Sequence, residues 1–297
     1  MNLAVVVIDT TQTRPDTGPM NTNHDHQPIL VLGANGKTGR RVAQRLRERG
    51  TAVRSGGRSA DPPFDWERPE TWGRALEGVR AVYVSYYPDL AAPGAVEAVG
   101  SFAERAMKSG VRRLVLLAGR GEPEAEEAEA AVWSSGAELT VLRSTWFAQN
   151  FSEDYMLEHV ASGTVALPAG DTPEPFVDAE DIADVAVAAL TDDRYVGELY
   201  ELTGPRLLTF DEAVGEIASA AGRDIRYAPV TVEEHADAAR AHGVPPEVVE
   251  LLTYLFTTVL DGRNARLADG VQRALGREPR DFADYARRTA ATGVWHA

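Results

Sequence analysis

The sequence contains no cysteine in its 297 residues. This absence excludes disulfide bonds, thiolate metal sites and a cysteine nucleophile, and it predicts a reducing, cytoplasmic environment. Long hydrophobic runs are also missing, because no apolar stretch approaches the roughly 20 residues that a transmembrane helix needs. The apolar segment at residues 3–8 is short, has no basic residue before it and runs into Asp9, so we expect no signal peptide.

Basic residues are fewer than acidic ones: the sequence has 30 Lys and Arg residues against 45 Asp and Glu residues, and its formal net charge is -15. A surface of this sign repels nucleic acid and anionic membranes, so we expect a small-molecule substrate and no partner of either kind. One basic cluster follows a glycine-rich turn, and we interpret most of it as a solvated helix face. Its members are Arg40, Arg41, Arg45, Arg47 and Arg49.

Three glycines at two-residue spacing, Gly33, Gly36 and Gly39, follow a short apolar run and precede a helical pattern. The first glycine allows a sharp turn out of a strand, the second lets backbone N–H groups approach a diphosphate, and the third lets the helix sit against the sheet. The positive end of the helix then faces the phosphates. We therefore predict a dinucleotide site at this turn, made by Gly33, Ala34, Asn35, Gly36, Lys37, Thr38 and Gly39.

The end of the next predicted strand, residues 51–55, indicates which dinucleotide is bound. An NAD-selective site places a carboxylate here against the ribose hydroxyls, but this chain continues Ser55-Gly-Gly-Arg58 and has no carboxylate until Asp61. Arg58 and Lys37 could instead bracket a 2′-phosphate, which favours NADPH over NADH. The alternative is that Arg58 is a surface loop charge.

Short apolar runs alternate with helical patterns along the chain. This alternation predicts an α/β fold, a Rossmann-type doubly wound parallel sheet with helices on both faces. Ligands bind beyond the carboxyl ends of such strands, so we expect Ser85, Tyr86, Ala118 and Gly119 beside the cofactor. The predicted strands are residues 29–32, 51–55, 64–66, 81–84, 113–117, 139–143 and 199–202, with helices at 69–76, 94–109 and after Asp181.

The domain organisation follows from the same pattern. Residues 1–27 are polar and turn-forming, and we expect a flexible extension without a metal site at its two histidines, His24 and His26. Residues 28–143 form the Rossmann core, which residues 179–204 complete. Residues 144–178 and 205–297 form a smaller, mainly helical substrate lobe and a polar tail, with helices at 211–221, 232–242 and 245–260.

Two segments bear on the substrate. The acidic run between Glu122 and Glu129 is interpreted as a solvated loop or helix face, although it would favour a cationic substrate if part of it rims the pocket. The aromatic segment after the strand at 139–143 is either a pocket wall or core packing, and its place after a sheet strand favours the wall. Its predicted pocket residues, with Tyr87, are Ser144, Thr145, Trp146, Phe147, Asn150 and Phe151.

Several motifs occur in a characteristic order. They are Gly33-Ala-Asn-Gly36-Lys-Thr-Gly39, Phe64-Asp65-Trp66, Leu142-Arg143 with Trp146-Phe147 and Asn150-Phe151, Pro175-Phe-Val-Asp178 with Asp181-Ile182-Ala183, and Tyr200-Glu-Leu-Thr-Gly204-Pro205. Over about residues 29–288 the chain resembles the NmrA-like atypical short-chain dehydrogenases. It is most similar to the branch of ergot-alkaloid-type reductases and type 2 NADPH:quinone oxidoreductases.

The resemblance implies a Rossmann domain with a smaller C-terminal lobe, NADPH in the long cleft and a substrate over the nicotinamide. It further implies that Asp65 and Trp66 lie near the adenine, and that Arg58 and Lys37 lie near the 2′-phosphate. Residues 144–151 would form part of the nicotinamide and substrate pocket.

The chain departs from the family's usual proton donor, a Tyr-x-x-x-Lys pair, because no lysine follows Lys108. The serine-rich end common on the fifth strand is replaced by Ala118-Gly-Arg120, and the usual proline after Arg143 is Ser144. An iminium or a quinone can accept a hydride without that pair. If an acid is needed, Tyr86 and Tyr87 are the candidate catalytic residues.

These observations predict an NADPH-dependent reductase of a small or mid-sized aromatic or heterocyclic metabolite, such as an iminium, enone or quinone, in secondary metabolism. A non-catalytic NADP(H) sensor that regulates a partner is one alternative, motivated by the missing pair. A non-redox cyclase or isomerase on the same fold is another. We expect a monomer or homodimer.

Overall fold

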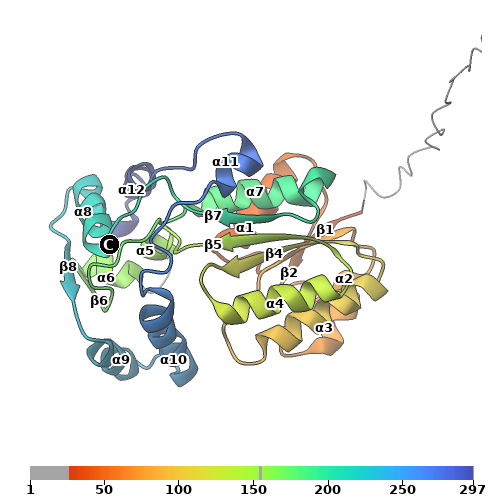
Figure 1. Ribbon diagram of the computed structural model, residues 1–297, viewed down its shortest axis with the longest axis horizontal. Helices are drawn as coiled ribbons and strands as arrows, with labels where there is room; N and C mark the ends of the chain where they lie inside the picture. Colours follow the sequence, from red (N-terminus) through yellow and green to blue (C-terminus); the bar gives the residue numbers. More distant parts are fainter. Residues whose placement is uncertain (1–26, 154–155, 297) are drawn as a thin grey trace, which may run out of the picture.

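The computed structural model describes residues 27–153 and 156–296 (Figure 1). The predicted N-terminal extension lies outside the described residues apart from Gln27. The elements are β1 (Ile29–Leu32), α1 (Lys37–Glu48), β2 (Val53–Gly56), η1 (Pro69–Thr71), α2 (Trp72–Leu76), β3 (Ala81–Val84), α3 (Ala95–Lys108), β4 (Arg113–Gly119), α4 (Pro123–Ser134), β5 (Glu138–Ser144), α5 (Asn150–Glu153), α6 (Met156–Ser162), β6 (Thr164–Leu167), α7 (Ala179–Thr191), η2 (Asp193–Tyr195), β7 (Leu199–Leu202), α8 (Phe210–Ala221), β8 (Arg226–Pro229), α9 (Val232–Ala241), α10 (Pro246–Tyr254), η3 (Leu255–Val259), α11 (Gly270–Leu275), α12 (Phe282–Ala290) and η4 (Val294–His296).

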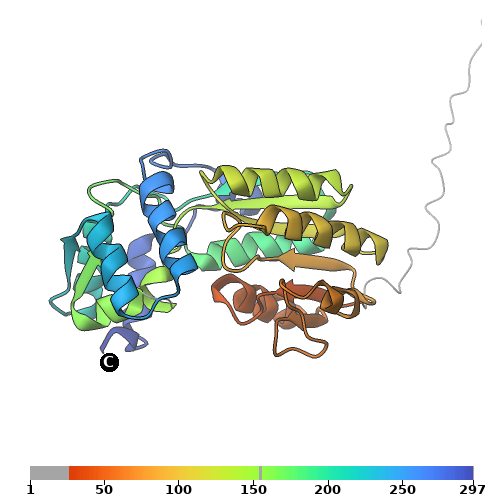
Figure 2. The same cartoon turned by 90° about the horizontal axis from the view of Figure 1, so that it is seen from below.

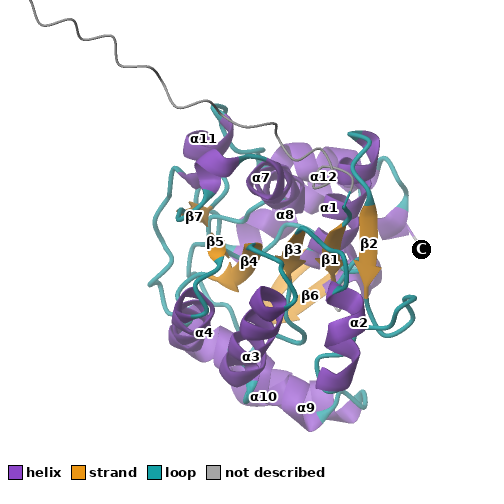
Figure 3. Ribbon diagram, turned by 90° about the vertical axis from the view of Figure 1, so that its right-hand side faces the viewer, coloured by secondary structure: helices purple, strands orange, loops and turns teal. Residues whose placement is uncertain are grey.

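The main sheet has six parallel strands in the order β2-β1-β3-β4-β5-β7. Helices α1 and α7 cover one face, and α2, α3 and α4 cover the other (Figure 3). Alternate residues of β1 serve the two cores, because Leu30 and Leu32 pack under α2–α4 while Ile29 and Val31 pack under α1 and α7. A strand buried on both faces is apolar throughout, which explains why its run is continuous. The predicted Rossmann-type α/β fold is confirmed.

The predicted strand at residues 64–66 is wrong, because these residues form a loop that leads into η1. Phe64 is buried, and its ring packs edge-on against Trp66 at 5.0 Å and against Phe102 of α3 at 5.6 Å. Trp72 closes the cluster and donates its indole N–H to the carbonyl oxygen of Asp65 at 2.8 Å. Aromatic burial against a helix, rather than pairing with β2, therefore fixes this segment.

The C-terminal lobe, formed by α5, α6, β6, α8, β8, α9, α10, η3, α12 and η4, lies at the carboxyl end of the sheet (Figures 1 and 2). It has its own hydrophobic core and a two-stranded parallel sheet, β6 with β8, that the sequence analysis did not predict. The expected polar tail is also wrong. The chain ends in α12 and η4, where Trp295 is fully buried and donates its indole N–H to the Phe151 carbonyl oxygen at 2.9 Å.

Polar contacts join the lobe to the sheet. Gln149, which precedes α5, donates to the Asp178 carboxylate at 2.7 Å, and its own amide oxygen accepts the first N–H of α7 at 2.8 Å.

The interpretation of the basic cluster after the glycine turn as a solvated helix face fails for two of its members. Arg41 pairs with Glu153 at 2.7 Å, and Arg45 binds Asp184 of α7 at 2.7 Å. The domain boundaries themselves stay a prediction.

Candidate active site

A cleft of about 1380 Å³ runs along the carboxyl ends of the sheet strands and under α9, α10 and η3. Ligand pockets for one drug-sized molecule measure about 300–1,000 Å³, so this cleft has room for a dinucleotide and a second molecule. Both the main sheet and the C-terminal lobe line it, which places the candidate active site between them.

The glycine turn opens into this cleft. Gly33 has φ +64°, and its N–H donates to the Gly56 carbonyl oxygen of β2 at 3.1 Å. Gly36 leads into α1 and its N–H donates to the Gly33 carbonyl oxygen at 2.8 Å, so side chains are absent where phosphates would approach. Five further predicted cofactor residues line the cleft with Gly33: Ala34, Asn35, Gly36, Lys37 and Thr38.

Gly39 is buried behind the turn and does not line the cleft. A Cβ on Gly39 would lie 2.2 Å from the carbonyl oxygen of Gly33, so only glycine allows α1 to sit this close to the turn. This is the close-packing role that the spacing predicts for the third glycine. The turn, the open cradle and the start of α1 together fit a diphosphate, although contact with a cofactor stays a prediction.

The segment after β2 supplies a cation to the cleft. Arg58 is exposed and lines the cleft together with Gly57 and Ser59, whereas Asp61 does not. Asp65 and Trp66 also line it, but the Asp65 carboxylate accepts the N–H of Glu67 at 3.2 Å. One arginine, Arg58, and two carboxylates, Asp65 and Glu67, thus line the cleft beyond β2.

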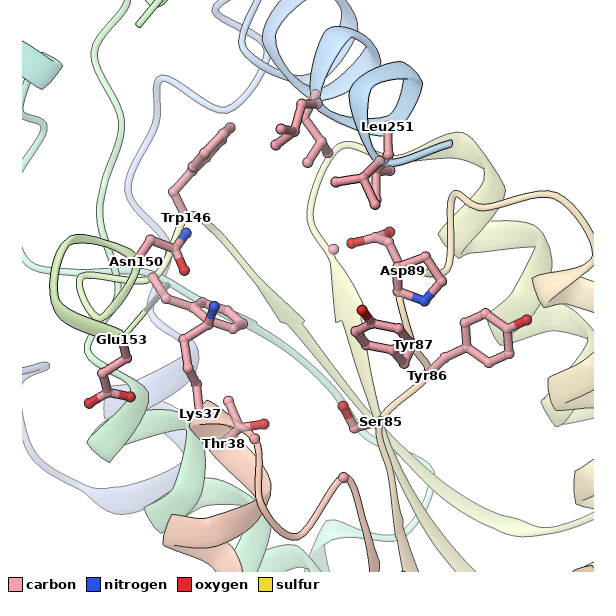
Figure 4. A pocket seen from close by; sticks show the side chains of 18 of the residues that line it. Lys37, Thr38, Ser85, Tyr86, Tyr87, Asp89, Trp146, Asn150, Glu153 and Leu251 are labelled. Carbon is pink, nitrogen blue, oxygen red and sulfur yellow. The ribbon is translucent and has the colours of Figure 1, made fainter. Parts of the chain in front are cut away.

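The two candidate tyrosines follow β3 and differ in environment. Tyr86 packs its ring on Trp66 at 4.9 Å, and burial, followed by the charge of Glu67, raises the pKa of its phenol. Tyr87 is 72% exposed. The two rings diverge from the strand end in Figure 4, although both residues line the cleft beside Ser85. Neither tyrosine combines burial with a group that favours proton release.

The segment after β5 supplies a wall of the cleft. Trp146 packs against Phe256 at 5.2 Å and against Phe210 at 5.5 Å, so it belongs both to the wall and to the lobe's core. Phe151 is not a pocket residue, because it is fully buried in that core and packs edge-on against Phe176 at 5.8 Å. The start of α5 turns it inward. The predicted residues that do line the cleft are Ser144, Thr145, Trp146, Phe147 and Asn150, and Ala118 lines it from β4.

The acidic run is only partly solvated. Glu126 and Glu127 of α4 are exposed, but Glu129 is 3% exposed and pairs with Arg143 at 2.7 Å. Glu122 is 5% exposed and lines the cleft. Burial, and next the charge of Asp89, raise the pKa of Glu122 to about 9. The interpretation of the run as a solvated face is therefore wrong for Glu122 and Glu129.

Asp89 and the residues that roof the cleft are functional candidates that were not predicted from the sequence. Asp89 follows the tyrosines, and Figure 4 shows its carboxyl turned into the cleft. The position of Asp89 shortly after the end of β3 was the sequence signal that could have predicted its place in the cleft. The roof is an apolar face of α10, η3 and the turn before them. Its residues are Val244, Val248, Leu251, Leu252, Leu255 and Val259.

The described part of the chain has neither a metal-binding cluster nor a membrane-spanning helix. Among residues 27–153 and 156–296 there is no group of three or more His, Asp or Glu side chains that could hold a metal ion. None of the helices described is both long and apolar enough to cross a bilayer.

The chain is similar in sequence to known oxidoreductases and similar in fold to solved structures of such proteins. No family model matches it. An uncharacterized oxidoreductase, YesF, of Bacillus subtilis is 31% identical over 281 residues, which cover 90% of this chain and 98% of that protein. Agroclavine dehydrogenase of Claviceps fusiformis is 31% identical over 280 residues, covering 86% and 95%. The structure of an NADPH-dependent quinone oxidoreductase from Escherichia coli in complex with NADPH has a TM-score of 0.69 at 18% identity, covering 88% and 99%.

The quinone oxidoreductase shows the shared fold, and the two relatives above 30% identity extend the likeness over nearly the whole chain. Together with the parallel sheet, they define the class as an NAD(P)H-dependent oxidoreductase. The chain belongs to the NmrA-like family of atypical short-chain dehydrogenases, which confirms the resemblance seen in its motifs.

Proposed function

We propose that the protein is an NADPH-dependent reductase of small or mid-sized aromatic or heterocyclic electrophiles: iminium ions, enones or quinones. The observation that carries this proposal is the composition of one continuous cleft. Its glycine turn fits a diphosphate, and its other end combines an apolar roof with Trp146 and Phe147. An apolar, aromatic chamber beside a dinucleotide site suits a flat electrophile.

The names of its relatives support the same substrate classes. One relative is named for the dehydrogenation of the ergot alkaloid agroclavine, and a structural neighbour is named for the reduction of quinones. A carboxylate at the reacting end would also favour a cationic substrate, and Asp89 lines the cleft.

NADPH is proposed over NADH because Arg58 and Lys37 line the cleft on the side of the glycine turn. A 2′-phosphate adds negative charge that an arginine near the end of β2 can accommodate. When bound, NADPH supplies the hydride, and the protein orients it and excludes water. We further propose a cytoplasmic monomer or homodimer that binds no nucleic acid.

The test is a steady-state assay of NADPH oxidation with three acceptors: a cyclic iminium, an enone and a quinone. We expect turnover with at least one, and tighter binding of NADPH than of NADH. Tight cofactor binding without turnover on any acceptor would contradict the proposal. If that binding also discriminated NADPH from NADP⁺ and a protein partner were captured, the result would favour the NADP(H) sensor. Turnover that persists after cofactor removal would favour a cyclase or isomerase.

A further inference from the structure

Reduction of a quinone or an enone needs a proton as well as a hydride, and the chain lacks the family's usual donor. Its two lysines are Lys37, in the glycine turn, and Lys108, which ends α3 and contacts Glu104 at 3.4 Å. Neither lies four residues after a tyrosine. Of the tyrosines after β3, Tyr86 packs at a tilt against Trp66 and Tyr87 is exposed, so another group that lines the cleft is needed as the acid.

Glu122 is placed to be that acid. It lies three residues beyond the end of β4, lines the cleft and is 5% exposed. Its carboxyl makes a side-chain hydrogen bond with Asp89, and its Oε2 atom is buried without a partner of its own. A buried polar atom without a partner is costly, so the position of this carboxyl at a ligand cleft makes it a candidate to contact a bound molecule.

Gly119 fixes where the carboxyl lies. A Cβ built on Gly119 would be 1.9 Å from Oε1 and 2.2 Å from Oε2 of Glu122, so the carboxyl rests directly on the glycine backbone. Gly119 is the last residue of β4 and pairs with Ser144, the last residue of β5. The carboxyl thus lies at the carboxyl ends of two central strands, which is where ligands of such sheets bind.

The groups around Glu122 are mostly acidic. Asp89 approaches from the loop after β3, and Glu124 of α4 accepts the phenol O–H of Tyr254 from α10 at 2.5 Å. The guanidinium of Arg263 pairs with Asp261 at 2.9 Å and donates to the Gly121 carbonyl oxygen at 3.0 Å, so these contacts do not involve Glu122.

The nearest arginine in sequence, Arg120, does not neutralise this cluster. Its guanidinium contacts Glu201 at 3.2 Å and the carbonyl oxygen of Arg266 at 2.9 Å. Burial and the charge of Asp89 raise the pKa of Glu122 to about 9, and burial also raises the pKa of Asp89. These effects favour retention of a proton by the carboxyl pair, and the hydrogen bond between the two raises the pKa of Glu122 while it lowers that of Asp89.

We propose that Glu122 is the proton donor of the reductase and that Asp89 is its positioning residue. This rests on the proposed function. In the step, a hydride adds to the electrophilic carbon, the electron pair of the π bond moves to the oxygen, and that oxygen takes the proton of Glu122. The products are the reduced substrate, oxidised cofactor and the Glu122 carboxylate, which solvent then protonates. An iminium ion needs no such proton, because the hydride alone neutralises it.

The first test compares Glu122→Gln with a matched control, Glu127→Gln, which changes an exposed residue of α4, the helix that Glu122 precedes. We expect Glu122→Gln to lower kcat/KM for a quinone by about 10²- to 10⁴-fold, the usual contribution of a general acid, and to leave reduction of a cyclic iminium unchanged. The control should leave both unchanged. Equal losses on the two acceptors, or no loss on either, would overturn the proposal.

The pH profile adds a second readout. Wild-type kcat/KM for the quinone should fall as pH rises through about 9, because the active form is the protonated one. Asp89→Asn removes a negative neighbour and should move this fall to lower pH. Gly119→Ala should displace the carboxyl and reproduce the loss seen with Glu122→Gln. A wild-type profile without this limb would overturn the assignment.

Infrared titration separates this proposal from the proposed function, because it needs no turnover. The difference spectrum between wild type and Glu122→Gln at neutral pH should contain a carboxylic acid C=O band that is missing from the difference between wild type and Glu127→Gln. Glu174, whose pKa burial raises to about 8, contributes equally to all three proteins and cancels in both differences. If the band is present but no acceptor is reduced, the proposed function fails while the protonated state of Glu122 stands. If turnover occurs and the band is absent, the proton donor is another group.

Discussion

The assignment of NADPH rests on Arg58, and Arg58→Ala tests it most directly. Arg58 is exposed and lines the cleft just beyond β2. The last residue of β2 and the residue before Arg58 are glycines, Gly56 and Gly57, so no carboxylate lies there. An arginine beside a phosphate at a solvated surface contributes about 1–2 kcal/mol, which corresponds to an increase in Kd of about 5- to 30-fold on removal. NADH lacks the 2′-phosphate, so its Kd should change little.

The measurement is a fluorescence titration of both cofactors against wild type, Arg58→Ala and a control. Arg68→Ala is a suitable control, because Arg68 lies in the same connection, pairs with Glu70 at 3.0 Å and does not line the cleft. The loss for NADPH should shrink as ionic strength rises, since the interaction is screened. An equal loss for NADPH and NADH, or the same loss in the control, would refute the 2′-phosphate assignment.

Three further predictions concern the scaffold. Gly39→Ala should weaken NADPH binding and lower Tm, because its Cβ would meet a turn carbonyl oxygen at 2.2 Å, whereas Gly215→Ala in α8 has open space and should stabilise by about 0.5–1 kcal/mol. Trp295→Ala should cost about 3–5 kcal/mol of unfolding free energy in urea titrations, because the side chain is fully buried; a loss below about 1 kcal/mol would show that the chain end is dispensable. Stability should fall in acid. Burial raises the pKa of Glu180, but hydrogen bonds from two arginines of α1 outweigh it and lower the pKa overall. Its pairing free energy is therefore present above the ordinary glutamate pKa of about 4.3 and lost as pH falls through the lowered value, and Glu180→Gln should flatten the urea midpoint against pH.

The sequence predicts the main sheet well because its strands are buried on both faces. Such strands must be apolar throughout, and the runs at β1, β3, β4 and β5 stand out against the helices between them. The segment at Phe64 and Trp66 is apolar for a different reason, since its rings fill an aromatic cluster with Trp72. Composition alone does not separate these two causes of burial, so a strand was predicted where a loop occurs.

Some residues of the candidate site could be predicted from the sequence and others could not. Residues that directly follow a strand, such as Ser85 and Ser144, lie in the cleft because the carboxyl ends of parallel strands share one edge. Glu122 stands within a run of like charges, and only the packing of α4 against β4 shows that it is buried. The apolar roof comes from Val244 to Val259, over a hundred residues after the strands that it covers, so no local pattern could assign it.

The charges of the cleft also indicate how a dinucleotide would be oriented. Lys37 and Arg58 line the end at the glycine turn, where Asp65, Glu67 and Glu153 also line the cleft, whereas Asp89 and Glu122 line it from the loops that follow β3 and β4. Phosphates belong with the cations. The nicotinamide becomes cationic when its hydride leaves, so it belongs with the acids, one of which becomes a carboxylate in the same reduction under our proposal. That carboxylate would hold the oxidised cofactor until solvent protonates it. Release of NADP⁺ and recovery of the acid would then be one coupled event, so loss of Glu122 should speed release while slowing quinone reduction.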